Sequence, residues 1–264
     1  MIASKPSRAI AGHLALAASL PIAACQDSVD HESAIRAIAD TYGVDIVYEV
    51  GPDFLPQEWQ APPLSGTATA IDDRELSRVL QVLPRWLEKY PVTILEENLV
   101  SVRLCRALQI VGVSYGGANH QGDLYLTVGT EREGYTARFL ELTFHHEFSS
   151  ILMYYHEFPR DEWLAANPPE VEYVIDPNRV LDLAQRERAT EGAEELYRIG
   201  LLAEYARADL VNDVNMYAEV AFGEPERMER LVDTYTAVRA KYEVLKSFYL
   251  GLDPRFAEWF ARIG

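Results

Sequence analysis

The sequence predicts an α+β fold, because strand-like segments gather in its first half and helix-like segments fill its second half. Residues 44–128 hold several runs rich in β-branched and aromatic residues, separated by turn-forming residues. From residue 136 onward the pattern is mainly helical. The chain has 264 residues, 48% of them hydrophobic, which is enough for one buried core and short for two. We therefore expect a single globular domain over residues 34–264, preceded by a targeting segment.

Residues 1–24 have the features of a signal peptide. Lys5 and Arg8 precede an apolar run over residues 9–24. This run is too short to span a bilayer and ends in small residues, as signal peptides do. The segment is therefore expected to direct the chain out of the cytoplasm.

The signal peptide ends in a motif similar to the bacterial lipobox, in which the cysteine is acylated and becomes the first residue. Residues 22–25 read Ile-Ala-Ala-Cys, and Gln26 follows where an aspartate would favour retention at the inner membrane. We therefore expect a lipid on Cys25, an outer-membrane location in a bacterial cell envelope, and a tether over residues 25–33. The alternative is an ordinary secretory signal with a cysteine there by chance.

The charge of the mature chain excludes some partners. Beyond residue 24 the sequence has 22 lysines and arginines against 41 aspartates and glutamates. A net charge of about −19 argues against nucleic acid and against adhesion to anionic lipid headgroups. Cys105 would be the remaining cysteine, so we expect no internal disulfide and a buried thiol. No glycine-rich phosphate loop follows a strand, so no nucleotide site is expected.

The elements predicted before residue 92 are separated by glycine and proline signals. Pro84 is expected to kink or break the last of them. In chain order these elements are a helix over residues 34–42 ended by Gly43, a strand over 44–50, a loop with four prolines over 51–70, and a helix over 74–90 capped by Asp72 or Asp73.

Between residues 92 and 129 the pattern changes to strands. The three expected strands cover residues 92–97, 99–117 and 123–129. Residues 116–122 are rich in turn formers and predict a turn that joins the last two strands into a hairpin.

A long helix should follow the hairpin. Nothing in residues 136–155 breaks a helix, and Pro159 ends the pattern. Gly200, Gly223 and Pro225 separate the segments that follow. These expected helical segments are residues 179–198, 209–222, 226–250 and 253–263.

The long helix carries an incomplete zinc-peptidase motif. Such enzymes need two imidazoles one helical turn apart and a glutamate beside the first, as in His-Glu-x-x-His. His146 and Glu147 meet this requirement, but Ser150 stands where the second imidazole belongs, and a serine hydroxyl is a poor zinc ligand. His145 has no partner histidine one turn away, and His156 lies roughly 15 Å beyond His146 along a helix axis.

Two segments together resemble a known family. Residues 139–152, FLELTFHHEFSSIL, look like the IHHEFAHIL helix of bacterial lipoproteins described as putative zinc-binding metallopeptidases, which are similar to gluzincins. The family's downstream Gly-Phe-x-x-x-Tyr-Ala segment is similar to residues 200–206, and its Glu-Asp-Phe-Ala-Glu helix to residues 212–219. The resemblance covers residues 90–222 and the lipoprotein signal. It implies a zincin-like domain, in which a small mixed β-sheet with a hairpin packs on the motif helix and a helical C-terminal half follows.

The resemblance also implies a third metal ligand, and two alignments place it differently. Matching the family's Tyr-Ala pair puts the ligand position on Asn212 and keeps Asp213. Matching the Phe-Ala-Glu ending puts it on Asn215 and keeps Glu219. Either way an amide replaces a carboxylate, so the zinc site is lost or rebuilt. Glu219 is then the strongest anionic ligand left, and Asp213 is the second.

Three functional hypotheses follow. The first is a non-catalytic descendant that keeps the cleft and the edge strand of the hairpin to bind a peptide or protein. The alternative is an active metal-dependent peptidase with a non-standard ligand set. In it His146 and Glu219 or Asp213 hold zinc, Glu147 is the general base, and Tyr205 resembles the family's tyrosine near the oxyanion. The third is a structural lipoprotein in which these groups are satisfied polar residues. The sequence leaves open whether the chain is an enzyme.

Overall fold

The computed structural model describes residues 30–174 and 192–264. The predicted signal peptide, Cys25 and part of the helix predicted over residues 179–198 lie outside these ranges. Helix α1 begins at His31, so the end of the predicted tether belongs to a helix. Among the described residues, no helix is both long enough and apolar enough to cross a membrane.

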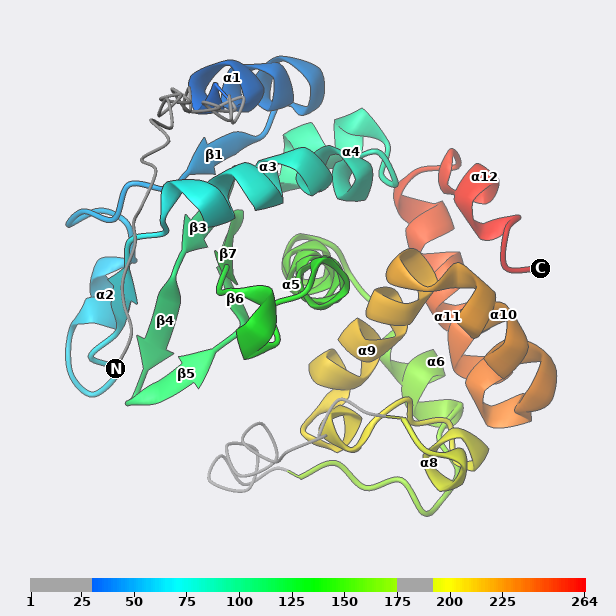
Figure 1. Cartoon of the computed structure of the whole chain (residues 1–264). Coiled ribbons are helices and arrows are strands. Elements are labelled where there is room, and N and C mark those ends of the chain that lie inside the picture. Colours follow the sequence, from blue (N-terminus) through cyan, green and yellow to red (C-terminus); the bar gives the residue numbers. More distant parts are fainter. Residues whose placement is uncertain (1–29, 175–191) are drawn as a thin grey trace, which may run out of the picture.

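A four-stranded mixed sheet forms the centre of the N-terminal half (Figure 1). The predicted hairpin is confirmed only for its second strand, β7. Its first strand is β6, formed by residues that were predicted to be the turn, and Gln121, at φ 52°, and Gly122 reverse the chain between the two strands. β1, β3 and β7 are parallel, whereas β6 pairs antiparallel with β7 and forms an edge. The strands lie in the order β1 (Asp45–Val47), β3 (Ser101–Cys105), β7 (Asp123–Thr127) and β6 (Gly117–His120).

A second, three-stranded sheet shows that the single strand predicted over residues 99–117 is wrong. That segment forms β3 in the first sheet and two strands in the second, with a reversal at Val111 and Gly112, both at positive φ. Cys105, where the chain leaves the first sheet, is fully buried, and burial raises the pKa of its thiol to about 12. The second sheet has the order β2 (Thr67–Thr69), β4 (Ala107–Ile110) and β5 (Val113–Tyr115), all antiparallel.

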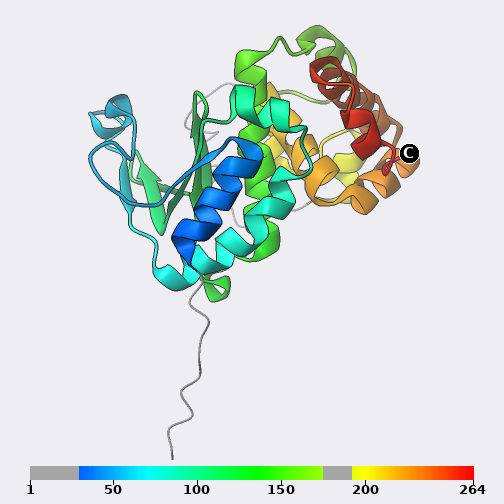
Figure 2. The ribbon, with the colours of Figure 1, turned by 90° about the horizontal axis from the view of Figure 1, so that it is seen from above.

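Helices α1 and α3 pack together and face the viewer in Figure 2. The predicted stop at Gly43 is confirmed, because this glycine has φ 68° and caps α1. Asp72, one of the two expected caps, caps α3. A kink or a break was expected at Pro84, and the helix continues past this residue without a break. The bounds are α1 (His31–Tyr42), α3 (Asp73–Leu87), and a short α2 (Gln57–Gln60) within the predicted loop.

The strand predicted over residues 92–97 is wrong, because this segment is helix α4 (Val92–Asn98). Pro91 precedes the helix, and Ile94, Leu95 and Asn98 are buried at helical spacing. The β-branched residues that suggested a strand are therefore overruled by a face that packs on the core.

Helix α5 (Ala137–Tyr155) lies between the sheets and the C-terminal helices, as both Figure 1 and Figure 2 show. Thr136 caps it, within one residue of the predicted start. Its buried residues face both sides, because the helix packs against β6 and β7 as well as against α9. The motif helix is therefore sandwiched at the centre of the molecule.

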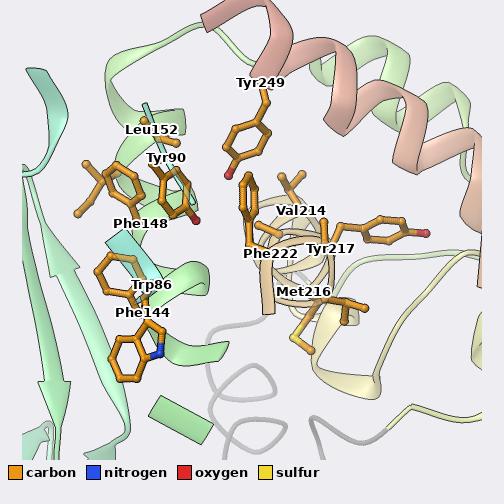
Figure 3. Packing of buried hydrophobic residues seen from close by; sticks show 14 of the residues in the cluster. Trp86, Tyr90, Phe144, Phe148, Leu152, Val214, Met216, Tyr217, Phe222 and Tyr249 are labelled. Carbon is orange, nitrogen blue, oxygen red and sulfur yellow. The ribbon is translucent and has the colours of Figure 1, made fainter. Parts of the chain in front are cut away.

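The C-terminal half is helical, which confirms the predicted α+β order of sheets first and helices second. The helix predicted over residues 226–250 is divided at Tyr235, where the backbone is extended. Aromatic side chains, among them Tyr90, Phe222 and Tyr249, bring α5, α9 and α11 into one core (Figure 3). The helices are α6 (Arg160–Ala165), α8 (Glu194–Arg198), α9 (Leu210–Gly223), α10 (Pro225–Thr234), α11 (Thr236–Leu252) and α12 (Phe256–Phe260), with short 3-10 helices η1 (Glu131–Glu133) and η2 (Glu204–Arg207).

Candidate functional site

The paired helices α5 and α9 bring the predicted site residues together. Both helices are apolar on most faces, so packing alone would give a dry interface. Instead, each helix turns polar side chains toward the other. Glu147, Asn215 and Glu219 are at least nine-tenths buried, which makes their hydrogen bonds energetically important. The cluster consists of His146, Glu147 and Ser150 from α5, with Asn212, Asn215 and Glu219 from α9.

His146 is held by a carboxylate from α9. Its Nδ1 atom lies 2.6 Å from Glu219 Oε1. Burial lowers the pKa of His146, but the hydrogen bond to Glu219, the charges of Glu219 and Glu147, and a contact with Asn212 outweigh it, so the pKa is raised on balance. A carboxylate bonded to one ring nitrogen orients the imidazole and leaves Nε2 for another partner, as carboxylates do behind metal-binding histidines. Glu219 is therefore placed as the residue that orients His146.

Ser150 and Asn215 are bonded to each other. Asn215 Nδ2 donates to Ser150 Oγ at 2.6 Å. Asn215 is 1% exposed, and its Oδ1 atom has no hydrogen-bond partner among the described residues. The two positions at which the resemblance implies zinc ligands are thus adjacent in space, which favours the alignment on the Phe-Ala-Glu ending over the one that selects Asn212.

Glu147 faces the edge strand β6. Its Oε2 atom accepts a hydrogen bond of 2.6 Å from Asn119 Nδ2. A Cβ atom on Gly117 would lie 3.1 Å from Glu147 Oε1 and 2.5 Å from Thr143 Cγ2, so this glycine lets the strand run directly over the helix. Burial raises the pKa of Glu147 more than His146 and Asn119 lower it. Sequence reasoning missed Asn119 and Gly117, although both stand in the glycine-rich segment that was assigned to a turn.

Tyr205 also joins the cluster. Its ring stacks on His146 with ring centroids 6.1 Å apart. Burial raises the pKa of its hydroxyl, and the charge of Glu147 raises it further. Tyr205 therefore stays neutral and can only donate or accept a hydrogen bond at this place.

Asp213 does not join the cluster, although it was a candidate metal ligand. It points to the opposite side of α9, where Asp213 Oδ2 accepts hydrogen bonds from Lys241 Nζ (2.6 Å), Trp163 Nε1 (3.0 Å) and the Tyr173 hydroxyl (2.6 Å). Asp213 and Lys241 are both fully buried. This ion pair, with its additional hydrogen bonds, connects α9 to α11, so Asp213 has a structural role.

His145 on α5 and His156, which directly follows this helix, bond to other residues. His145 Nδ1 is 2.8 Å from the Tyr90 hydroxyl in the core, and His156 Nε2 is 2.8 Å from Asn98 Oδ1. Neither forms a pair with His146.

A zinc ion does not fit the donor set at this place. Zinc sites in proteins use imidazole, thiolate and carboxylate ligands. Here the expected ligand positions beside His146 hold a hydroxyl and an amide that are already bonded to each other. The carboxylate of Glu219 is bonded to His146 itself, and that of Glu147 is bonded to Asn119. Within residues 30–174 and 192–264, no three His, Cys, Asp or Glu side chains are grouped so that they could hold a metal ion.

Two cavities flank the cluster along α5. One of about 900 Å³ lies toward the C-terminal end of the helix and is lined by Asn119, Ser150 and Tyr154. The other, of about 400 Å³, lies toward the N-terminal end and is lined by Phe139, Thr143 and Glu219. The polar cluster therefore lies between two cavities along α5. Asn119 of β6 lines the larger one, and the smaller one is lined by Phe139 and Thr143, which lie against Gly116 and Gly117. We call the two cavities and the cluster between them the groove.

The arrangement of a mixed sheet, an antiparallel edge strand and paired site helices is a metallopeptidase-like fold. The solved structure of a putative zinc-binding metallo-peptidase from Bacteroides caccae ATCC 43185 has a TM-score of 0.54 to this chain. The match covers 89% of this chain and 92% of that one, at 15% sequence identity. Identity this low establishes the fold alone. No protein-family model and no curated protein matches the chain significantly.

Proposed function

We propose that this chain is a non-catalytic, peptide-binding descendant of a metallopeptidase fold. The observation that carries the proposal is the hydrogen bond between Ser150 and Asn215, which closes the two positions where zinc ligands are expected. The side chains that remain, His146 with Glu219 and Glu147 with Asn119, form hydrogen-bonded pairs and keep the groove polar. These hydrogen bonds support a site whose side chains now bind one another instead of a metal ion.

The edge strand β6 supplies the means of binding a peptide. Hydrogen-bonded and non-bonded residue pairs alternate along antiparallel strands. Thr127 N–H donates to Gly116 O at 2.9 Å, so the pairs that contain Gly117 and Asn119 are the non-bonded ones. The backbone N–H and C=O groups of Gly117 and Asn119 therefore point away from β7, toward the free edge above α5. A peptide in extended form can add to such an edge by main-chain hydrogen bonds.

The cellular setting of this proposal comes from the predicted lipobox. A lipid on Cys25 would attach the chain to the bacterial outer membrane, and the tether would leave the groove open to peptides or proteins of the envelope. The alternative function is a metal-dependent peptidase with a non-standard ligand set, favoured by the zinc-binding name of the structural neighbour.

Metal analysis separates these two functions. The full chain is purified in detergent without a histidine tag, and its zinc content is measured near neutral pH. We expect no stoichiometric zinc. Stoichiometric zinc that disappears in His146→Ala would refute the non-catalytic proposal and support the peptidase.

Peptide binding is tested with a proline in the edge strand. An equimolar mixture of random acetylated hexapeptides, half free acids and half amides, is passed over the immobilised chain, and captured peptides are titrated by fluorescence polarisation. Asn119→Pro removes the free backbone N–H but no β6–β7 hydrogen bond, because Asn119 belongs to a non-bonded pair. Proline is tolerated at such edge positions. We expect it to abolish capture, whereas Asn119→Ala keeps the N–H and retains measurable binding. Absence of capture by the unmodified chain would sink the proposal.

A further inference from the structure

The groove has a direction, because β6 and α5 run the same way. Gly116 lies against Phe139, Gly117 against Thr143, and Asn119 against Glu147, so successive strand residues meet successive turns of the helix. A peptide that pairs antiparallel with β6 would therefore point its C-terminus toward the N-terminal end of α5. A parallel peptide would point its C-terminus the other way.

The N-terminal end of the groove carries two arginines. Arg138 and Arg227 both line the smaller cavity. Both bond to a single carboxylate: Arg138 Nε donates to Glu224 Oε1 at 2.5 Å, and Arg227 Nη1 donates to Glu224 Oε2 at 2.6 Å. Two guanidinium groups thus share one negative charge. Glu219 also lines the cavity, but its carboxylate is paired with His146. Among the described residues that line this cavity, two arginines stand against one glutamate, so positive charge is in excess there, in a protein whose formal net charge is −17.

The opposite end has the opposite charge. The larger cavity, beyond Ser150, is lined by Glu157, Asp161 and Glu162, against which only one arginine, Arg160, stands among its described lining residues. A free carboxylate is therefore favoured at the Arg138 end and disfavoured at the Glu157 end. Only the antiparallel direction of binding satisfies both ends.

We propose that the groove binds the C-terminal end of a peptide, antiparallel to β6, with the terminal carboxylate at Arg138 and Arg227. This inference rests on the proposed peptide-binding function and adds to it the part of the partner that is recognised. β6 has four residues, about 13 Å of extended chain, so the strand pairs with only a few residues upstream of the carboxylate. The partner is accordingly a short peptide or a protein whose C-terminus is exposed and extended.

Matched peptides test this inference on the full chain. Each captured sequence is synthesised as an acetylated free acid and as the corresponding amide, and both are titrated by fluorescence polarisation. We expect the free acid to bind about tenfold more tightly, as for a hydrogen-bonded charged group. Arg138→Gln and Arg227→Gln should each reduce this preference toward one while leaving the affinity for the amide unchanged. Arg132→Gln, an exposed arginine that does not line the cavity, is the matched control and should keep the tenfold preference.

The outcomes separate the two proposals. Equal binding of acid and amide would overturn the C-terminal inference and leave the groove as a site for internal peptide segments. A preference for the acid that survives both arginine substitutions would also overturn it. Binding of neither peptide would refute the proposed function itself. Because the amide is titrated on every variant, a variant that fails to fold is recognised by the loss of both affinities.

Discussion

A zinc site should reappear when its two altered positions are restored. Ser150→His places a second imidazole one helical turn from His146, and Asn215→Glu places a carboxylate beside it, because Ser150 Oγ and Asn215 Nδ2 are 2.6 Å apart. Ser150 lines a cavity of about 900 Å³, so the imidazole has room. Asn215 is 1% exposed, and the additional methylene of glutamate should cost about 1–3 kcal/mol in the metal-free protein.

The expected affinity follows from the number of ligands. Structural zinc sites with four protein ligands have apparent binding free energies of about 10–16 kcal/mol, and a three-ligand site belongs near the lower limit. A value of about 10 kcal/mol corresponds to a Kd on the order of 50 nM. Zinc at about one hundred times the Kd would then stabilise the double variant by about 2.7 kcal/mol and raise its Tm by about 5–10 °C.

Isothermal titration and thermal unfolding with and without zinc measure both quantities. Ser150→His with Asn212→Glu has the same composition with the carboxylate one turn away, so it should bind zinc more weakly. Glu219→Gln, added to the restored site, should weaken zinc binding about 10- to 100-fold, because Glu219 orients His146. If neither double variant binds zinc, the assignment of these positions as former ligands is refuted.

Three further predictions concern stability and targeting. Burial lowers the pKa of the His145 imidazole to about 4, so on acidification this side chain is protonated in the unfolded chain, below about pH 6.5, before it is protonated in the native chain. The free energy of unfolding should therefore fall by about 2 kcal/mol between pH 7 and pH 5. If His145→Gln shows the same pH dependence of stability, His145 is not its cause. Lys241→Met leaves Asp213 charged and buried, and should lower the free energy of unfolding in urea by about 3–5 kcal/mol. The double variant with Asp213→Asn should lose less stability than the sum of the two single variants. Strict additivity of the two losses would argue against a coupled pair. Cys25→Ser should abolish labelling by a palmitate analogue and release the chain from the membrane fraction, and persistent labelling would show that the lipid is elsewhere.

Local signals explain why several elements were predicted closely. α1, α5 and α9 each begin after a capping aspartate or threonine, and residues that favour a helix follow each cap without a break. The wrong predictions concern segments whose secondary structure depends on contacts with residues far away in the sequence. Residues 92–97 have strand-like composition, yet they form a helix because their apolar face packs on the core. Residues 99–117 read as one strand but divide between two sheets, since each part finds a different neighbour.

The sequence by itself determined the incomplete motif: His146 and Glu147 stand on a helix, with a serine where a second imidazole would complete it. The family resemblance adds that an asparagine stands at the third-ligand position. These are chemical facts about residue types at helical spacing. Only the tertiary structure decided which residues meet. It joined Asn215 to Ser150, turned Asp213 to the far side of α9, and brought Asn119 of β6 onto Glu147. The reason is that helical periodicity assigns a residue to a face of its own helix, whereas the rotation and register of two packed helices are set by all the buried side chains between them.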